Sequence, residues 1–211
     1  KYGIPQMKGS QTKELILEHA RELFLELGYE GVSMRMLASR CSISLGLIYH
    51  YFVSKDALFA DVVRPVLQTL EYVLVEHNSE GQCSEAIFED VERGQYQIFL
   101  LLITKYRREL RLLLMHATGS PYEHYEEEFV AKNYQLGKAY LRRMGEKYPE
   151  MHTDLSEQLI KINVENWLHV LKALLDERLS DGQRAQILLE YFAFTTAGWE
   201  RLLRGLLPKL K

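Results

Sequence analysis

Apolar residues recur at helical spacing along nearly the whole chain. The first such stripe consists of Ile16, Ala20, Leu23, Phe24 and Leu27. Spacings of three and four residues place these side chains on one face of an α-helix. We expect Ser10 or Thr12 to cap this helix and Gly28 to end it. No alternating strand pattern and no internal repeat is present, so the pattern predicts an all-α protein.

Two short helices are predicted next. Ser33 is placed to cap the first, which extends through Arg40, and Ser44 is placed to cap the second, which extends through Tyr51. Residues 41–43 break the pattern between them. The result is a pair of short helices joined by a turn.

Longer helices are predicted in the rest of the chain. Ser54 can cap one whose apolar stripe reaches Leu74. Pro65 lies inside this stripe, and because proline lacks a backbone N–H donor we expect a kink there. Polar breaks at 77–84, 118–121, 147–154 and 179–182 separate the later helices. We therefore expect about nine helices in two parts, joined near residues 55–75.

Charge is distributed unevenly. The net charge is −3 and the pI about 6.2, which by themselves give no hint of nucleic-acid binding. Residues 33–55, however, contain no Asp or Glu, while Arg35, Arg40 and Lys55 are present. Such an acid-free basic window in an acidic chain indicates a local anionic partner, with chance as the alternative. By contrast, the i, i+4 row of Glu residues at 14–26 is interpreted as a solvated helix face.

The cysteine and hydropathy patterns indicate in which compartment the protein is expected. Cys41 and Cys83 are far apart and lack metal-ligand spacing, which is typical of a reducing cytoplasm. The longest apolar run, residues 98–103, is too short to span a membrane. His124 and Glu128 can offer two metal ligands from one helix, but no third is apparent. We expect a cytoplasmic protein with no membrane segment, no metal site and no cofactor.

Five short motifs in the first 59 residues stand in a recognisable order. They are A-x-x-L-F at 20–24, GYEGVS at 28–33, LA at 37–38, IS-x-G-x-IY-x-YF at 43–52, and SK-x-AL at 54–58. This stretch resembles the DNA-binding domain of the TetR family of bacterial transcriptional repressors over about 50 of the 211 residues. The short helices at 33–51 would then be a helix-turn-helix, whose second helix enters the DNA major groove.

The sequence departs from the family pattern at two positions. Ser42 stands in the turn where the family often has Gly, and a left-handed conformation there costs a non-Gly residue free energy. Leu45 stands where many members carry a polar or basic residue, so an apolar contact replaces a hydrogen bond or a phosphate contact.

The side chains of the second short helix and its surroundings suit DNA. Arg35 can fork onto a guanine edge or pair with a phosphate, and Leu45 and Leu47 offer apolar surface to thymine methyl groups. Gly46 permits close approach of the DNA backbone. The other predicted contacts have hydroxyl, imidazole or ammonium groups, which can donate hydrogen bonds to phosphate oxygens. The predicted DNA-binding residues are Ser33, Arg35, Ser44, Leu45, Gly46, Leu47, Tyr49, His50 and Lys55.

Other residues of the same window have structural interpretations. Ile48 and Phe52 are expected in the core. Tyr51 is open between packing on the first helix and contact with DNA. Arg40 is interpreted as a solvated charge or a peripheral phosphate contact, and Cys41 as a small buried residue.

The resemblance implies a DNA-binding domain at 1–55 and a helical ligand-binding and dimerisation domain at 56–211. The last two helices, expected at 154–180 and 183–205, are the candidates for a homodimer interface, where Gly198 would permit close crossing. Ordinary intrachain packing is the alternative. Candidate ligand residues are large or polar groups on apolar faces, and each has ordinary core packing or a satisfied buried amide as its alternative: Tyr96, Phe99, Met115, His116, Phe129, Asn163, Asn166 and Trp167.

The sequence admits three classes of function. The first is a ligand-responsive dimeric repressor, released from a palindromic double-stranded operator by a small hydrophobic molecule. The second is an enzyme, but no nucleophile elbow, Gly-rich phosphate loop, HExxH motif or triad is present. The third is a helical protein-interaction module. The motif order favours the first, so we expect a regulator and not an enzyme.

Overall fold

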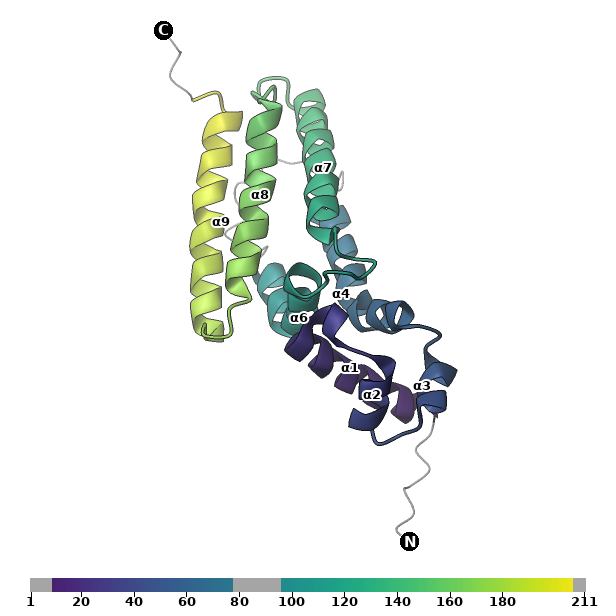
Figure 1. The fold of residues 1–211 in the computed structure, drawn as a ribbon. Coiled ribbons are helices and arrows are strands. Elements are labelled where there is room, and N and C mark those ends of the chain that lie inside the picture. The colour runs from purple at the N-terminus through teal and green to yellow at the C-terminus, as the bar shows by residue number, and fades with distance from the viewer. Residues whose placement is uncertain (1–8, 78–95, 207–211) are drawn as a thin grey trace. The chain divides into compact units, whose positions relative to one another are not determined.

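The computed structural model of the chain describes residues 9–77 and 96–206 (Figure 1). Within these residues it contains eight α-helices and no strand, which confirms the all-α prediction and comes close to the predicted nine helices. No helix in these ranges is long and apolar enough to cross a membrane. The helices are α1 (Gly9–Gly31), α2 (Met34–Arg40), α3 (Leu45–Tyr51), α4 (Lys55–His77), α6 (Tyr96–Met115), α7 (Tyr125–Lys147), α8 (Glu157–Leu174) and α9 (Asp181–Leu203).

The helices form two compact units. The head unit contains the chain up to residue 67 together with residues 108–125, and the C-terminal unit contains residues 68–107 and 126 onward. Helices α4 and α6 therefore each contribute one part to each unit. The predicted functional division at residue 55 stays a prediction.

An aromatic cluster forms the centre of the head unit. The ring of Phe59 from α4 lies 5.0 Å from that of Phe24 and 5.2 Å from that of Tyr29, nearly perpendicular to both. Such edge-to-face contacts add to the burial energy of the rings. Ile16 and Ala20 of the predicted α1 stripe are fully buried in the same unit.

The observed ends of α1 differ in part from the predicted ones. The helix begins at Gly9, so both Ser10 and Thr12 lie inside it and neither caps it. At the other end Gly28 adopts φ +70°, a left-handed conformation that breaks the helix as expected. Leu27 was wrongly placed in the buried stripe, since its side chain is 47% exposed. It stands at the edge of the stripe, immediately before the break.

A buried arginine joins α8 to α9 in the C-terminal unit. The guanidinium of Arg184 is 1% exposed; its Nε donates to the Leu174 carbonyl at 2.9 Å and an η-nitrogen donates to the Asp176 carbonyl at 2.6 Å. The Asp181 carboxylate accepts at 3.0 Å. Carbonyls at the end of α8 are thus satisfied by a cation, which also suits the helix dipole.

The helix bounds in this unit differ from the predicted ones. Helix α8 starts only after Ser156, whose hydroxyl caps it, and ends at Leu174 because the chain turns there toward Arg184. Helix α9 starts two residues earlier than expected, since Ser180 and Gln183 form a capping box. The two helices lie side by side in Figure 1.

The proline expected to kink α4 lies in an uninterrupted helix, whereas α6 is broken at another position. Helix α4 is one helix from Lys55 to His77 with Pro65 inside it. Helix α6 is broken at Tyr106, which has φ −116° and ψ 23°. No Pro or Gly marks that position in the sequence, so it was not predicted.

Ser42 is the non-glycine residue with positive φ among the described residues, at 55°. Since this conformation costs an L-residue about 1 kcal/mol, Ser42→Gly is expected to raise the free energy of unfolding by about that amount. Urea denaturation measures it. Ser39→Gly, on the exposed face of α2, is the matched control and should lower stability by about 0.5 kcal/mol. A Ser42→Gly variant less stable than wild type would contradict the prediction.

Candidate nucleic-acid interface

The two short helices of the head are each started by a serine. The Ser33 hydroxyl accepts from Met36 N–H, and the Ser44 hydroxyl accepts from Leu47 N–H, each at 3.2 Å. Between them the chain turns at Ser42, and Ile43 N–H donates back to the Ala38 carbonyl at 3.0 Å. These bonds confirm the predicted helix starts and fix the turn between α2 and α3.

Helix α3 has two opposed faces. Ile48 is 0% exposed and Phe52, which ends the helix, is 2% exposed, as predicted. Gly46 and His50 project on the opposite side and are exposed. Tyr49 is 48% exposed. Helix α3 is therefore held to the head by its buried face, while its opposite face is exposed.

The remaining residues of α3 lie between these faces. Leu45 and Leu47 are partly exposed, flanking Gly46. Tyr51 is also partly exposed, and its ring lies edge-on to that of His50, with centroids 5.2 Å apart. Arg35 is exposed on α2. All nine residues predicted to contact DNA, Lys55 included, are exposed or partly exposed.

Lys55 has a structural role in addition to any contact with DNA. Its ammonium donates to the carbonyls of Tyr29 at 2.9 Å and Val32 at 3.0 Å, and lies 4.1 Å from the Tyr29 ring centroid. A cation at the end of α1 satisfies carbonyls that lack helical partners. One ammonium hydrogen remains for a phosphate.

Tyr29 links the same region to the start of α4. Its hydroxyl donates to the Asp56 carboxylate. Burial, and then the bond to Asp56, raise the pKa of the Tyr29 hydroxyl, so the group stays protonated over the physiological range. The Tyr29 N–H donates to the His116 carbonyl at 3.0 Å, which attaches the 108–125 segment to the end of α1.

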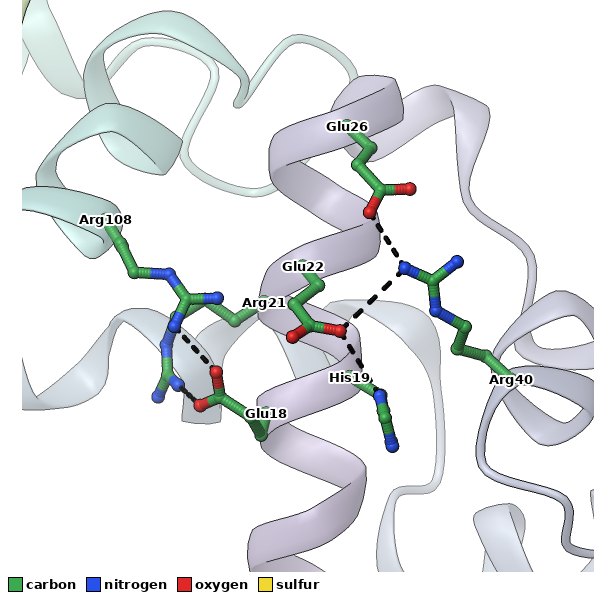
Figure 2. Close-up of polar contacts among 7 residues, drawn as sticks. All are labelled: Glu18, His19, Arg21, Glu22, Glu26, Arg40 and Arg108. Carbon is green, nitrogen blue, oxygen red and sulfur yellow. Dashed lines mark hydrogen bonds and ion pairs between the residues drawn. The ribbon is translucent and has the colours of Figure 1, made fainter. Parts of the chain in front are cut away.

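Arg40 reaches back from α2 to α1. Its guanidinium lies 2.8 Å from the Glu26 carboxylate and 3.9 Å from that of Glu22 (Figure 2). Glu22 also meets His19 at 3.3 Å. These partly exposed pairs are weak individually. They nevertheless direct the Arg40 side chain along α1, an outcome that neither sequence interpretation of Arg40 had included.

The other edge of the acidic row meets α6. Arg108 lies 2.6 Å from the Glu18 carboxylate, which also pairs with Arg21 (Figure 2). The hydrogen bond from Arg108 lowers the pKa of Glu18 against the opposing effect of burial. Arg21 in turn lies 2.6 Å from Glu109. The row is therefore a solvated face, as interpreted, with cations of two other helices paired to it.

The candidate ligand residues divide between the units. Met115 and His116 belong to the head unit, at and just beyond the end of α6, where burial and the Arg111 charge lower the pKa of His116. The other six belong to the C-terminal unit. Among these, the rings of Phe99 and Trp167 meet with centroids 5.0 Å apart.

The polar candidates of the C-terminal unit have different surroundings. The Asn163 amide donates to the Leu159 carbonyl of its own helix at 2.9 Å, and Asn166 is exposed. Phe129 is buried on α7 and Tyr96 is partly exposed at the start of α6. No group of three or more His, Cys, Asp or Glu side chains in the described ranges is arranged to hold a metal ion.

Helices α2 and α3, with their turn and their opposed faces, define a helix-turn-helix DNA-binding module. Residues 16–62 match the family model described as "Bacterial regulatory proteins, tetR family". These residues therefore form a TetR-type DNA-binding domain, as the order of the sequence motifs predicted.

Curated relatives support the same conclusion. The chain is 40% identical over 58 residues to the HTH-type transcriptional regulator UidR of Escherichia coli strain K12, covering 28% of this chain and 30% of that protein. It is 34% identical over 101 residues to the HTH-type transcriptional repressor AcnR of Corynebacterium glutamicum, covering 48% and 53%. The chain thus matches about a third to a half of the length of these two transcriptional regulators.

A solved structure shares the overall fold. The chain aligns with NalD, the secondary repressor of the MexAB-OprM multidrug efflux pump in Pseudomonas aeruginosa, with a TM-score of 0.55 and 21% identity. The alignment covers 90% of this chain and 98% of that one. At this identity the likeness concerns the fold alone.

The two bonds from Lys55 to carbonyls predict a stability effect without DNA. Lys55→Met should lower the free energy of unfolding by about 2 kcal/mol, since both hydrogen bonds involve a charged donor. Urea denaturation of the DNA-free protein measures it. Lys13→Met, which removes a partly exposed pair with Asp61 at 2.8 Å, is the control and should cost about 1 kcal/mol or less. Equal stability of the two variants would mean that Lys55 does not support the head.

Proposed function

We propose that the chain is a dimeric, ligand-responsive transcriptional regulator of the cytoplasm, a repressor released from a palindromic operator by a small hydrophobic molecule. The observation that carries this proposal is the outer surface of α3. It is anchored by Ile48 and Phe52 and stands in a window, 33–55, without any carboxylate side chain. Duplex DNA is the anionic partner that a helix-turn-helix suits. AcnR and NalD are repressors, which supports the direction of regulation.

The DNA-binding role falls to residues 1–55 in this proposal, and ligand binding and dimerisation to residues 56–211. Tyr49 and His50 project from α3 with ring donors suited to phosphate oxygens. Arg35 projects from α2 with a guanidinium suited to a guanine edge. Lys55 uses its remaining donor for a phosphate.

Dimerisation is proposed to occur through exposed apolar surface on the last two helices. On α9, Ile187 and Phe194 share a face with Gly198, and Phe194 is 78% exposed. A Cβ added at Gly198 would meet nothing within 4 Å, so its lack of a side chain serves no packing within the chain. On α8, Ile162 is exposed as well. A two-fold pairing of these faces would carry two heads to two half-sites.

The effector is proposed to bind among aromatic side chains of the C-terminal unit. Trp167 of α8 stacks on Tyr191 at 5.8 Å and meets Phe192 edge-on at 5.8 Å, and Phe99 of α6 joins them. Burial raises the pKa of the Tyr191 hydroxyl, as expected in apolar surroundings. An apolar ligand suits such a lining, with Asn166 and Tyr96 as nearby candidates for polar contacts.

Release of DNA requires that the effector bind one conformer better than the other, because a ligand shifts an equilibrium only by its difference in affinity. Helices α4 and α6 each pass from one unit into the other. They are the covalent routes by which binding in the C-terminal unit can reach the head.

The proposal is tested first on DNA. A mobility-shift assay with the region upstream of the protein's own gene should show a complex that depends on a palindrome and weakens with salt. Arg35→Ala should reduce affinity by roughly 1–3 kcal/mol at one base pair per half-site and relax base preference there. The measurement is a binding curve on duplexes varied at each position.

Arg40→Ala is the matched control, since its guanidinium is directed to Glu22 and Glu26. Any loss it causes should be equal for all sequences. A uniform loss with Arg35→Ala would make that residue a phosphate contact. If the wild-type protein binds every duplex equally, or binds none at low salt, the proposal of a repressor is wrong.

The dimer is tested through Phe194. Phe194→Glu places a charge in the proposed apolar interface, where an unpaired charge is costly, so the variant should be a monomer at concentrations where the wild type is a dimer. Size-exclusion chromatography with light scattering gives the mass. Tyr72→Glu, at a 66% exposed position of α4, is the control and should remain dimeric. A dimeric Phe194→Glu variant would place the interface elsewhere.

A further inference from the structure

Helix α3 lacks the side chains that usually read base edges. Direct readout relies on Arg or Lys for guanine, Asn or Gln for adenine, and Asp or Glu for cytosine. None of these residue types occurs from Ser44 to Tyr51. The helix that the fold presents to the major groove therefore has no bidentate hydrogen-bonding side chain.

Its accessible surface is instead partly apolar. Gly46 lies opposite the buried Ile48, and the nearest atom to a Cβ built on Gly46 is 4.0 Å away, so the helix surface there is open. Leu45 and Leu47 flank that opening and are partly exposed. Because no side chain projects between them, both leucines can approach the floor of the groove.

The backbone N–H of Leu47 is not available to replace the missing side chains. The Leu47 N–H is already taken by the Ser44 hydroxyl at 3.2 Å and the Ser44 carbonyl at 3.0 Å. The side chains of α3 that are accessible for readout include the two leucines and the rings of Tyr49 and His50.

Two of the three cations in the acid-free window are held within the protein. Arg40 pairs with Glu22 and Glu26, and Lys55 donates to two carbonyls. Arg35 remains as the exposed guanidinium of the window. One charged base reader and two apolar ones are thus available in each head.

We propose that α3 reads thymine through the 5-methyl group, which Leu45 and Leu47 cover in the major groove. The inference rests on the proposed function and specifies its DNA. Each half-site would carry thymines under α3, with Arg35 of α2 free to select a guanine. The 5-methyl group is the apolar feature that distinguishes thymine in the major groove.

The test removes only the methyl groups. A duplex is first selected from a random library with the full chain, and thymines of its half-sites are then replaced one at a time by deoxyuracil. This change keeps the Watson–Crick hydrogen bonds. Covering one methyl group with apolar surface corresponds to roughly a fourfold gain in affinity, so each contacted position should weaken about fourfold on replacement. Fluorescence anisotropy gives the thymine-to-uracil affinity ratio at each position.

Protein variants assign the effect to the leucines. With Leu45→Ala or Leu47→Ala, the ratio at one position per half-site should fall to about one. Leu27→Ala, at an exposed leucine of α1 outside the window, is the control and should keep every ratio. Circular dichroism melting of each variant verifies that the head remains folded, which partial exposure of both leucines allows.

The outcomes separate the inference from the proposed function. Sequence-selective binding that is equal for thymine and uracil at every position would overturn the inference and leave the regulator intact. So would leucine variants that bind more weakly but keep the wild-type ratios. If the library yields no preferred duplex, the proposed function fails and the inference fails with it.

Discussion

The burial of Ile48 and Phe52 is the constraint on which the DNA-binding surface depends. Helix α3 has seven residues, too few to be stable alone in water, so its existence rests on this apolar anchoring and on the Ser44 cap. Once Ile48 faces inward, helical geometry places Gly46 and His50 on the outside. The same anchoring that stabilises the helix therefore decides which side chains meet a ligand.

Much of the positive charge near α3 supports the head as well as any contact with DNA. The Lys55 ammonium closes the end of α1, and the Arg40 guanidinium is directed along the acidic face of the same helix. A charge count in the 33–55 window consequently overstates the free positive charge. What remains for base recognition is one guanidinium and a partly apolar helix face, which gives the proposed operator a definite chemical character.

The C-terminal unit contains a buried charged side chain and a highly exposed aromatic side chain on the same helix. Arg184 is buried because three acceptors surround its guanidinium, whereas Phe194 on the same helix is exposed. A buried charge is tolerated only with such partners, and a helix face that gathers exposed apolar side chains, as α9 does with Ile187 and Phe194, is a candidate interaction surface. The first feature joins α8 to α9 within one chain, and the second leaves their outer faces available to a second copy.

The sequence by itself determined the all-α class, the starts of α2 and α3, and the division of α3 into buried and exposed residues. These depend on bonds across three residues and on a local period, which the sequence displays directly. Only the tertiary structure decided that Lys55 meets Tyr29 and Val32, 26 and 23 residues away, and that α6 breaks at Tyr106. Such contacts depend on how separate helices pack against one another. The spacing of residue types along the chain does not predict that packing.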